Sequence, residues 1–597
     1  SHDQIQRASY LLVPEEERAA FHLKIGRSLR DWSSSEEMNS FLFIMMDQMH
    51  RGSSCISDHE EKIGLSRLSL KAGQMACGMS AFLPAAAYLK CGIGLLVDED
   101  WDLHRSLCFD LYNLCAETEC ILGDFDDMKI HLEDALKRAH TLQERLRPNL
   151  TLVQSLGSQG CVIDAINTGL SVMIQLGEPF PHILTETSTK KDIMMTQSLL
   201  RTKSEEELVQ LQVMVDGEKQ QTMKFLHILT LYIFAEHPKY FPMIVCRMVR
   251  LSLLHGICKE SAFGFAIYGV VLIGFLDDTA GGYRIGKVAI DIMNKFQAQE
   301  NLAKVYAVVH GFLSPWAEPI QVTLPPLKHA IEVGLATGDT EWAMTASHIY
   351  AGTALFSGQA LGPLALEMKQ HKKNMLEYKQ HFVEQVQKPV LQTVLNLVGP
   401  SSDPTKLFDE EMDENNRHNH AHALHLHYRM WLEFLFGDYQ RAWKTRDMIQ
   451  GEHGESMLRF IHVCNHIFYT GLTALALARK EGKHAYTDCI DDSIKKMKKW
   501  AASTPWNCGH KLELLHAENA YLEGDEDGAA KAYDSAIALA ANNSFLHEQG
   551  LALERAGVFY FERQKCDIAL EFFRKAHDCY TQWGACSKAA HVQVTYL

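Results

Sequence analysis

Residues 522–536 read Leu-Glu-Gly-Asp-Glu-Asp-Gly-Ala-Ala-Lys-Ala-Tyr-Asp-Ser-Ala. Counted from the turn glycine Gly524, a small residue comes fifth (Ala529), an aromatic residue ninth (Tyr533) and another small residue twelfth (Ala536). Small residues at helical spacing let two helices approach closely, while the bulky residue between them fixes how the helices pack. This stretch therefore predicts a tetratricopeptide-like helix pair.

The same offsets recur elsewhere in the chain. Counted from Gln564 they give Ala569, Phe573 and Ala576, and we group Trp583, at the end of that stretch, with these structural repeat positions. Less complete copies of the pattern begin at Gly73, Gly123, Gly338 and Gly437. A repeated helix pair buries its apolar face against the next pair. We therefore expect an all-α fold in which stacked antiparallel helix pairs form a tetratricopeptide-like superhelical array.

The bulk composition is that of a folded protein with an acidic surface. The chain has 597 residues, of which 47% are hydrophobic and 22% charged, and its net charge is −16. An acidic surface repels phosphate groups, so we expect neither nucleic acid nor a membrane as a partner. The longest apolar run, residues 265–276, is too short to span a bilayer and fits a buried helix better than a strand.

One change of composition divides the helical pattern. Residues 399–415 are rich in turn formers and then acidic, and they predict a flexible surface loop. This loop separates an N-terminal helical repeat block, residues 1–398, from a C-terminal tetratricopeptide-like block, residues 416–597. A stacked array can extend this far without further domain boundaries.

Within the first block the pattern predicts several helix boundaries. Two helices are expected to meet near Gly73, inside residues 61–96. Residues 150–176 read as a single long helix that Gly177 stops. Residues 186–217 are polar, and we expect a looser structure there.

The fifteen cysteines include no Cys-x-x-Cys pair. Most of them lie inside helical patterns, where a cysteine behaves as a small apolar residue. A structural zinc site needs ligands at short spacings, and a disulfide framework is typical of small secreted chains. The cysteines therefore indicate reduced thiols and a cytoplasmic protein.

A histidine-rich segment is the one candidate for metal binding. His418, His422 and His425 fall on one face of a helix, which would present their imidazoles together. Because no nearby cysteine or acidic residue completes the set, the solvated start of a helix is the favoured interpretation. We predict no metal or cofactor site.

Residues 281–288 resemble the first part of a phosphate-binding loop, Gly-x4-Gly-Lys-Ser/Thr. Val288 replaces the hydroxyl that would hold magnesium, and the acids Asp277 and Asp278 lie where a phosphate would arrive. We interpret Gly281-Gly282 as a turn between helices. Since no nucleophile or metalloprotease motif is present either, the chain is not expected to be an enzyme.

The two ends of the chain resemble one family of large signalling proteins. The segments that carry the resemblance are residues 3–10, 12–18, 22–27, 71–92, 529–540, 543–554, 559–560 and 580–588. They are similar to the helical region of hybrid histidine kinases and serine/threonine kinases that contain an AAA-type ATPase. The resemblance implies a tetratricopeptide-like scaffold or signal relay between the ATPase and a sensor or kinase module. Any catalytic modules would then lie outside these residues.

Two functions remain open at this point. In the first, the array is a scaffold for protein–protein interaction in signal transduction, and it holds a peptide, a protein or neighbouring domains of a parent protein. In the second, the superhelix encloses a small-molecule effector. An open groove with charged rims favours the first function, and a deep pocket lined by aromatic residues favours the second. An all-helical enzyme without known motifs is a more distant third.

Overall fold

The computed structural model describes residues 10–32, 37–181, 185–399, 403–407, 419–452 and 460–597. Within these residues every regular element is a helix, apart from one isolated parallel bridge between Val213 and Ile257. The predicted all-α class is confirmed. The chain forms two compact units, Ser1–Ser155 and Leu156–Leu597, and each is described by itself.

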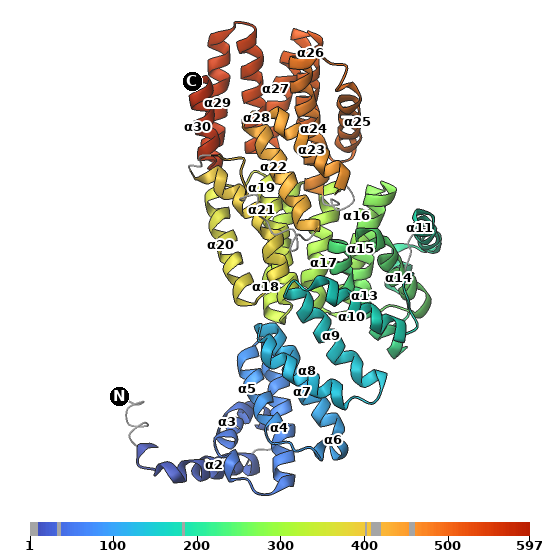
Figure 1. Cartoon of the computed structure of the whole chain (residues 1–597), viewed down its shortest axis with the longest axis vertical. Coiled ribbons are helices and arrows are strands. Elements are labelled where there is room, and N and C mark those ends of the chain that lie inside the picture. The colour runs from blue at the N-terminus through green and yellow to red at the C-terminus, as the bar shows by residue number, and fades with distance from the viewer. Residues whose placement is uncertain (1–9, 33–36, 182–184, 400–402, 408–418, 453–459) are drawn as a thin grey trace. The chain divides into compact units, whose positions relative to one another are not determined.

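In the first unit, drawn in blue in Figure 1, consecutive helices pack as pairs: α2 with α3, α4 with α5, and α7 with α8. Its elements are η1 (Glu15–Glu17), α2 (Arg18–Trp32), α3 (Glu37–Arg51), η2 (Ser53–Cys55), α4 (His59–Gly78), α5 (Phe82–Ile93), α6 (Asp100–Leu103), α7 (Arg105–Leu122), α8 (Phe125–Arg138) and the first part of α9 (Leu142–Ser158).

The second unit begins with helices α10 to α21. These elements are α10 (Val162–Gln175), α11 (Glu186–Arg201), α12 (Glu205–Val209), α13 (Gly217–Glu236), η3 (Pro238–Tyr240), α14 (Phe241–His255), α15 (Lys259–Leu276), α16 (Thr279–Phe296), η4 (Gln299–Asn301), α17 (Leu302–Val308), η5 (Val309–Leu313), η6 (Ser314–Trp316), η7 (Ile320–Thr323), α18 (Leu324–Thr337), α19 (Thr340–Phe356), α20 (Leu361–Glu377) and α21 (His381–Val398).

The second unit continues with α22 to α30. These are α22 (Asn419–Leu435), α23 (Tyr439–Glu452), α24 (Phe460–Glu481), α25 (Thr487–Ser503), α26 (Pro505–Glu523), α27 (Glu526–Asn542), α28 (Leu546–Glu562), α29 (Cys566–Trp583) and α30 (Cys586–Tyr596). Each helix from α26 to α29 packs against the next, and short connections make neighbours antiparallel. Figure 1 shows these helices in orange and red.

The prediction that two helices meet near Gly73 is wrong. Helix α4 continues through this glycine, and the chain turns only between Met79 and Ala81. Gly73 is buried, and a Cβ atom built there would lie 2.6 Å from Cγ of Leu89 on α5. The glycine therefore serves the close approach of α4 to α5 and does not mark a turn.

Two other predicted boundaries also differ. Residues 150–176 are not one helix, because Gly160, with a φ of 84°, separates α9 from α10. Residues 186–217 are more regular than predicted, since α11 and α12 occupy most of them. Both helices begin at a capping box, in which the Thr185 and Ser204 side chains accept a hydrogen bond from a backbone N–H of the first turn.

The predicted division at residues 399–415 lies within the second compact unit. Most of that segment lies outside the described residues. Within the second unit, Asn507 of α26 donates to the carbonyl oxygens of Pro315 and Glu318, at 2.8 Å each. The indole N–H of Trp583 donates to the carbonyl of Gln359 at 3.0 Å. These hydrogen bonds join helices from both sides of the predicted loop.

The repeat motif builds a cap and a buried contact. Gly524 ends α26 in the left-handed conformation, with a φ of 81°. The Asp525 side chain then accepts a hydrogen bond from the backbone N–H of Gly528 in the first turn of α27. The Tyr533 hydroxyl donates to a carboxylate oxygen of Glu518 at 2.8 Å. All seven structural repeat positions are buried: Ala529, Tyr533, Ala536, Ala569, Phe573, Ala576 and Trp583.

We expect Ala536→Leu to lower the free energy of unfolding by about 1–3 kcal/mol, because overpacking a filled core displaces its neighbours. Ala536 is completely buried, whereas Ala538 on the same helix is exposed. Ala538→Leu is therefore the matched control and should leave stability nearly unchanged. Urea denaturation measures both variants. Equal stability of the two variants would contradict the packing role of Ala536.

Among the described residues, two helices are long and apolar enough to cross a membrane by length and composition, Lys259–Leu276 and Phe460–Glu481. Most of each apolar stretch is buried among the other helices of the second unit. Burial of this kind is what the core helices of a helical protein require. Residues 265–276 belong to the first of these helices, so the sequence-based choice of helix over strand is confirmed.

Candidate functional site

The second unit contains a cavity of about 70 Å³ enclosed by helices from several parts of the sequence. Helices α13, α15, α19 and α21 supply most of its wall, and α22 adds His420. The lining combines aliphatic side chains with six phenylalanine and tryptophan rings. The rings are Phe234, Phe241, Phe263, Phe312, Trp342 and Phe382.

Aromatic contacts fix the shape of this wall. The Phe263 ring packs edge-on against Trp342, with centroids 5.2 Å apart, and lies stacked on His227 at 4.5 Å. The Phe234 ring contacts Phe241 at 5.1 Å and His420 at 5.3 Å. Rings that pack edge-to-face hold one another in place, so the cavity is largely preformed.

The polar groups of the wall leave an almost entirely apolar surface. Thr230 and Thr345 donate their hydroxyl hydrogens to carbonyl oxygens of their own helices, at 2.7 and 2.8 Å. The Nδ1 atom of His348 is 3.1 Å from the amide oxygen of Gln387. A cavity of about 70 Å³ surrounded by carbon suits only a very small apolar molecule or group, because benzene occupies a cavity of about 150 Å³.

A buried carboxyl group lies beside this wall. Glu341, next to Trp342 in α19, accepts a hydrogen bond from the Tyr232 hydroxyl at 2.8 Å. Burial raises the pKa of Glu341 to about 8, and nearby Asp339 adds to the effect. The folded protein therefore holds this carboxyl neutral at pH values where the unfolded chain ionises it.

This raised pKa predicts how stability depends on pH. The folded state binds one more proton than the unfolded state between the ordinary pKa of 4.5 and about 8, so Glu341 makes stability fall as pH rises through that window. Glu341→Gln keeps an oxygen that accepts from Tyr232 and cannot ionise. We expect the variant to be more stable than the wild type near pH 8 and to have a flatter pH profile in denaturant titrations. Identical pH profiles would contradict the assignment.

The three histidines proposed as weak metal candidates are described only in part. His418 lies outside the described residues. His422 and His425 lie on α22, half-buried, with their rings stacked 6.2 Å apart. The neighbouring His427 is more deeply buried than these two histidines, and its ring packs against Phe356 with centroids 5.9 Å apart. The described part of the segment, from Asn419 onward, is therefore packed against other residues and is not only a solvated helix start.

The phosphate-loop lookalike is helical. Gly281 and Gly282 lie inside the first turn of α16, so the predicted turn is misplaced, and the chain turns instead at Asp277, whose φ is 55°. The Asp278 carboxylate accepts from the Gly281 N–H at 2.8 Å. A carboxylate thus occupies the helix N-terminus, where a phosphate-binding loop would present free amide groups.

Sequence reasoning did not single out the residues that line the cavity. Their aromatic and aliphatic side chains follow ordinary helical spacing, which is equally typical of a core. The only signal was indirect, namely the completely apolar character of residues 265–276.

No family model matches the chain. Over 452 residues it is 23% identical to "Hybrid signal transduction histidine kinase G" of Dictyostelium discoideum. This match covers 66% of the chain and 13% of the relative's length. The similarity relates the chain to part of a signalling protein.

Proposed function

We propose that the chain is a non-catalytic helical scaffold or signal relay of a cytoplasmic signalling protein. Its stacked helix pairs would hold a protein or peptide partner, or neighbouring domains of a longer chain. The observation that carries this proposal is the series α26 to α30, in which each helix packs on the next and the repeat positions are buried. Stacked pairs of this kind present extended surfaces for binding.

The comparison supports the signalling part of the proposal. The relative is described as a signal transduction histidine kinase, and this chain corresponds to a small share of its length. A tetratricopeptide-like region between an ATPase and a sensor or kinase module would make up only a small part of such a protein, which agrees with the 13% of the relative's length that the match covers. The motifs at the two ends of the chain support the same position. All fifteen cysteines are free thiols, which supports the cytoplasm as the location.

Binding of a protein partner is tested with the purified, folded chain. The tagged chain is incubated with extract from its source cells, cross-linked and analysed by mass spectrometry, and an unrelated helical-repeat protein of similar size and charge is the control. We expect the same partner in replicate captures, with cross-links on one continuous helix surface. Scattered cross-links, or a partner shared with the control, would contradict the scaffold function.

The aromatic cavity supports a second candidate function, the sensing of a small-molecule effector. Its lining is carbon-rich and held in place by ring contacts, which is the character expected of a site for an apolar ligand. Binding there would join helices α13, α15, α19 and α21, so a ligand would stabilise the packing of the second unit.

Xenon under pressure is a suitable probe of this cavity, because a volume of about 70 Å³ is too small for a benzene ring. A ligand that binds only the folded state stabilises it, so xenon should raise Tm measurably. Ile267→Trp fills the cavity and should abolish the shift, whereas Leu366→Trp, at an exposed position of α20, should preserve it. The absence of any shift in the wild type would exclude effector binding at this cavity and leave the scaffold proposal standing.

A further inference from the structure

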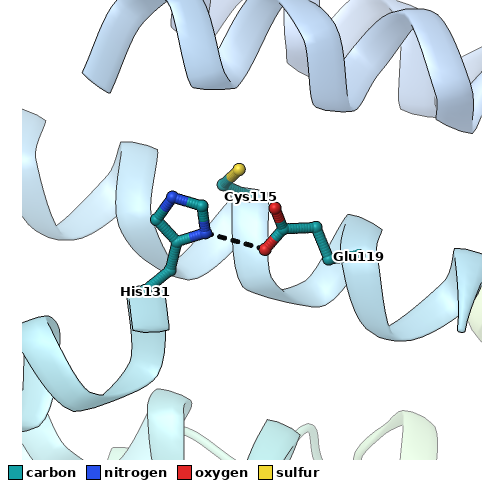
Figure 2. A group of neighbouring side chains, drawn as sticks. All are labelled: Cys115, Glu119 and His131. Carbon is teal, nitrogen blue, oxygen red and sulfur yellow. Dashed lines mark hydrogen bonds and ion pairs between the residues drawn. The ribbon is translucent and has the colours of Figure 1, made fainter. Parts of the chain in front are cut away.

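Three side chains of different chemistry converge in the first unit. Cys115 and Glu119 are four residues apart on α7, which places them on one face of the helix, and His131 reaches them from α8. One ligand atom from each side chain lies within 4.8 Å of the other two. Figure 2 shows the three side chains gathered between the two helices, with His131 hydrogen-bonded to Glu119.

From this geometry we infer that Cys115, Glu119 and His131 form a binding site for a divalent transition-metal ion of the zinc type. A thiolate, a carboxylate and an imidazole are all ordinary zinc ligands. In a tetrahedral site the ligand atoms lie about 3.3–3.6 Å apart, given zinc–ligand bonds of roughly 2.0–2.3 Å. The wider pairs would therefore have to close by up to about 1.5 Å, while Nδ1 of His131 and the Glu119 oxygen, now 2.8 Å apart, would have to separate slightly. Side-chain rotation can supply both movements. Water would be the fourth ligand.

The surroundings already hold this cluster in place. Cys115 and Glu119 are completely buried, while the His131 side chain is 14% exposed and gives the site a path to solvent. The Nδ1 atom of His131 is 2.8 Å from a carboxylate oxygen of Glu119. The Tyr112 ring packs edge-on against the imidazole, with centroids 5.7 Å apart. Burial and these contacts therefore keep the three side chains close to one another.

Charge around the cluster balances when a divalent ion is present. Lys90 on α5 is 3.1 Å from Glu119 and 2.6 Å from Asp127, so two carboxylates share one ammonium group. With a divalent ion bound, the Cys115 thiolate and the Glu119 carboxylate neutralise the metal. Lys90 and Asp127 then neutralise each other at the surface.

The bound ion would replace a proton on sulfur. A thiol binds a metal ion as the thiolate, so the Cys115 proton must leave when the ion binds. Binding transfers the thiol proton to water or buffer as the metal–sulfur bond forms, and no electrons are exchanged. Affinity should therefore rise with pH.

Cobalt(II) is the probe, because its thiolate complexes have an ultraviolet charge-transfer absorption that imidazole or carboxylate complexes lack. The full-length chain is stripped with a chelator and titrated with cobalt, and zinc is then added as a competitor. We expect a thiolate band that reaches its maximum at one cobalt per chain and that zinc abolishes. A folded wild-type chain without this band would overturn the inference, even if the histidines of α22 bound cobalt.

Matched variants assign the ligands. Cys115→Ser should lose the band, while Cys108→Ser, which replaces another buried cysteine of α7, should keep it. If Cys115→Ser does not fold, His131→Gln decides the question, with cobalt affinity expected to fall about tenfold or more. Lys90→Gln should tighten cobalt binding because it removes a competing cation. A band that persists in folded Cys115→Ser, or unchanged affinity in His131→Gln, would refute the site.

Discussion

Glu518→Gln is expected to lower the free energy of unfolding by about 3–5 kcal/mol, the range found when one member of a buried ion cluster is removed. The Glu518 carboxylate on α26 is 1% exposed and lies between two guanidinium groups. Arg555 approaches it at 2.8 Å and Arg479 at 2.7 Å. Neutral glutamine would leave the buried Arg555 and the largely buried Arg479 without the anion that compensates for their desolvation.

The same cluster predicts sensitivity to acid. Burial would raise the pKa of Glu518, but Arg479 and Arg555 outweigh it and lower the pKa to about 2. A carboxyl group with a depressed pKa stabilises the fold fully above its ordinary pKa of 4.5, and this contribution is lost as pH falls towards about 2. The wild type should therefore lose stability between these values, and Glu518→Gln should lose less.

Denaturant titrations at neutral and acidic pH measure both effects. Glu523→Gln is the matched control, because Glu523 lies on the same helix with its side chain 47% exposed and pairs with the exposed Lys483. An exposed pair contributes about 0–1 kcal/mol. If the two variants were equally stable, the buried cluster would not be the source of the stability assigned to it.

Gly256→Ala is expected to destabilise the second unit by about 2–5 kcal/mol, from backbone strain and lost hydrogen bonds together. Gly256 has a φ of 95°, which L-residues rarely adopt, and a Cβ atom there would lie 2.5 Å from the carbonyl oxygen of Gln212. That carbonyl accepts from the Ile257 N–H at 2.8 Å, and the Met214 N–H donates to the Ile257 carbonyl at the same distance. An added methyl group must push this isolated bridge apart.

Gly437→Ala is the control that measures the backbone strain of a positive φ without the steric clash of Gly256→Ala. Gly437 also has a positive φ, 85°, but a Cβ atom there would meet no heavy atom within 4 Å. We expect Gly437→Ala to lower the free energy of unfolding by only about 1–2 kcal/mol, the cost of placing an L-residue in the left-handed conformation. Thermal unfolding of both variants gives the comparison. A Gly256→Ala variant no less stable than Gly437→Ala would show that the bridge yields without loss.

The sequence by itself determined the helical class and the local form of the repeat. Gly524 ends a helix and Asp525 caps the next one because both effects act between residues close in the chain. The small residues at Ala529 and Ala536 also follow helical spacing, so their burial was predictable. The capping box at Ser204 was an equally local signal that the prediction of a looser segment overlooked.

Only the tertiary structure decided which of these helices face one another. The partners of Glu518 come from α24 and α28, and the aromatic cavity draws on helices from Thr230 to His420. His131 meets Glu119 across the turn at Gly123, although neither residue stands out in the sequence. Periodicity shows which face of a helix is buried, but the groups that cover that face depend on side chains far away in the chain. The same limit explains the wrong prediction at Gly73. A glycine is needed there because the Leu89 side chain of the neighbouring helix leaves no space for a Cβ atom, and the sequence does not show that contact.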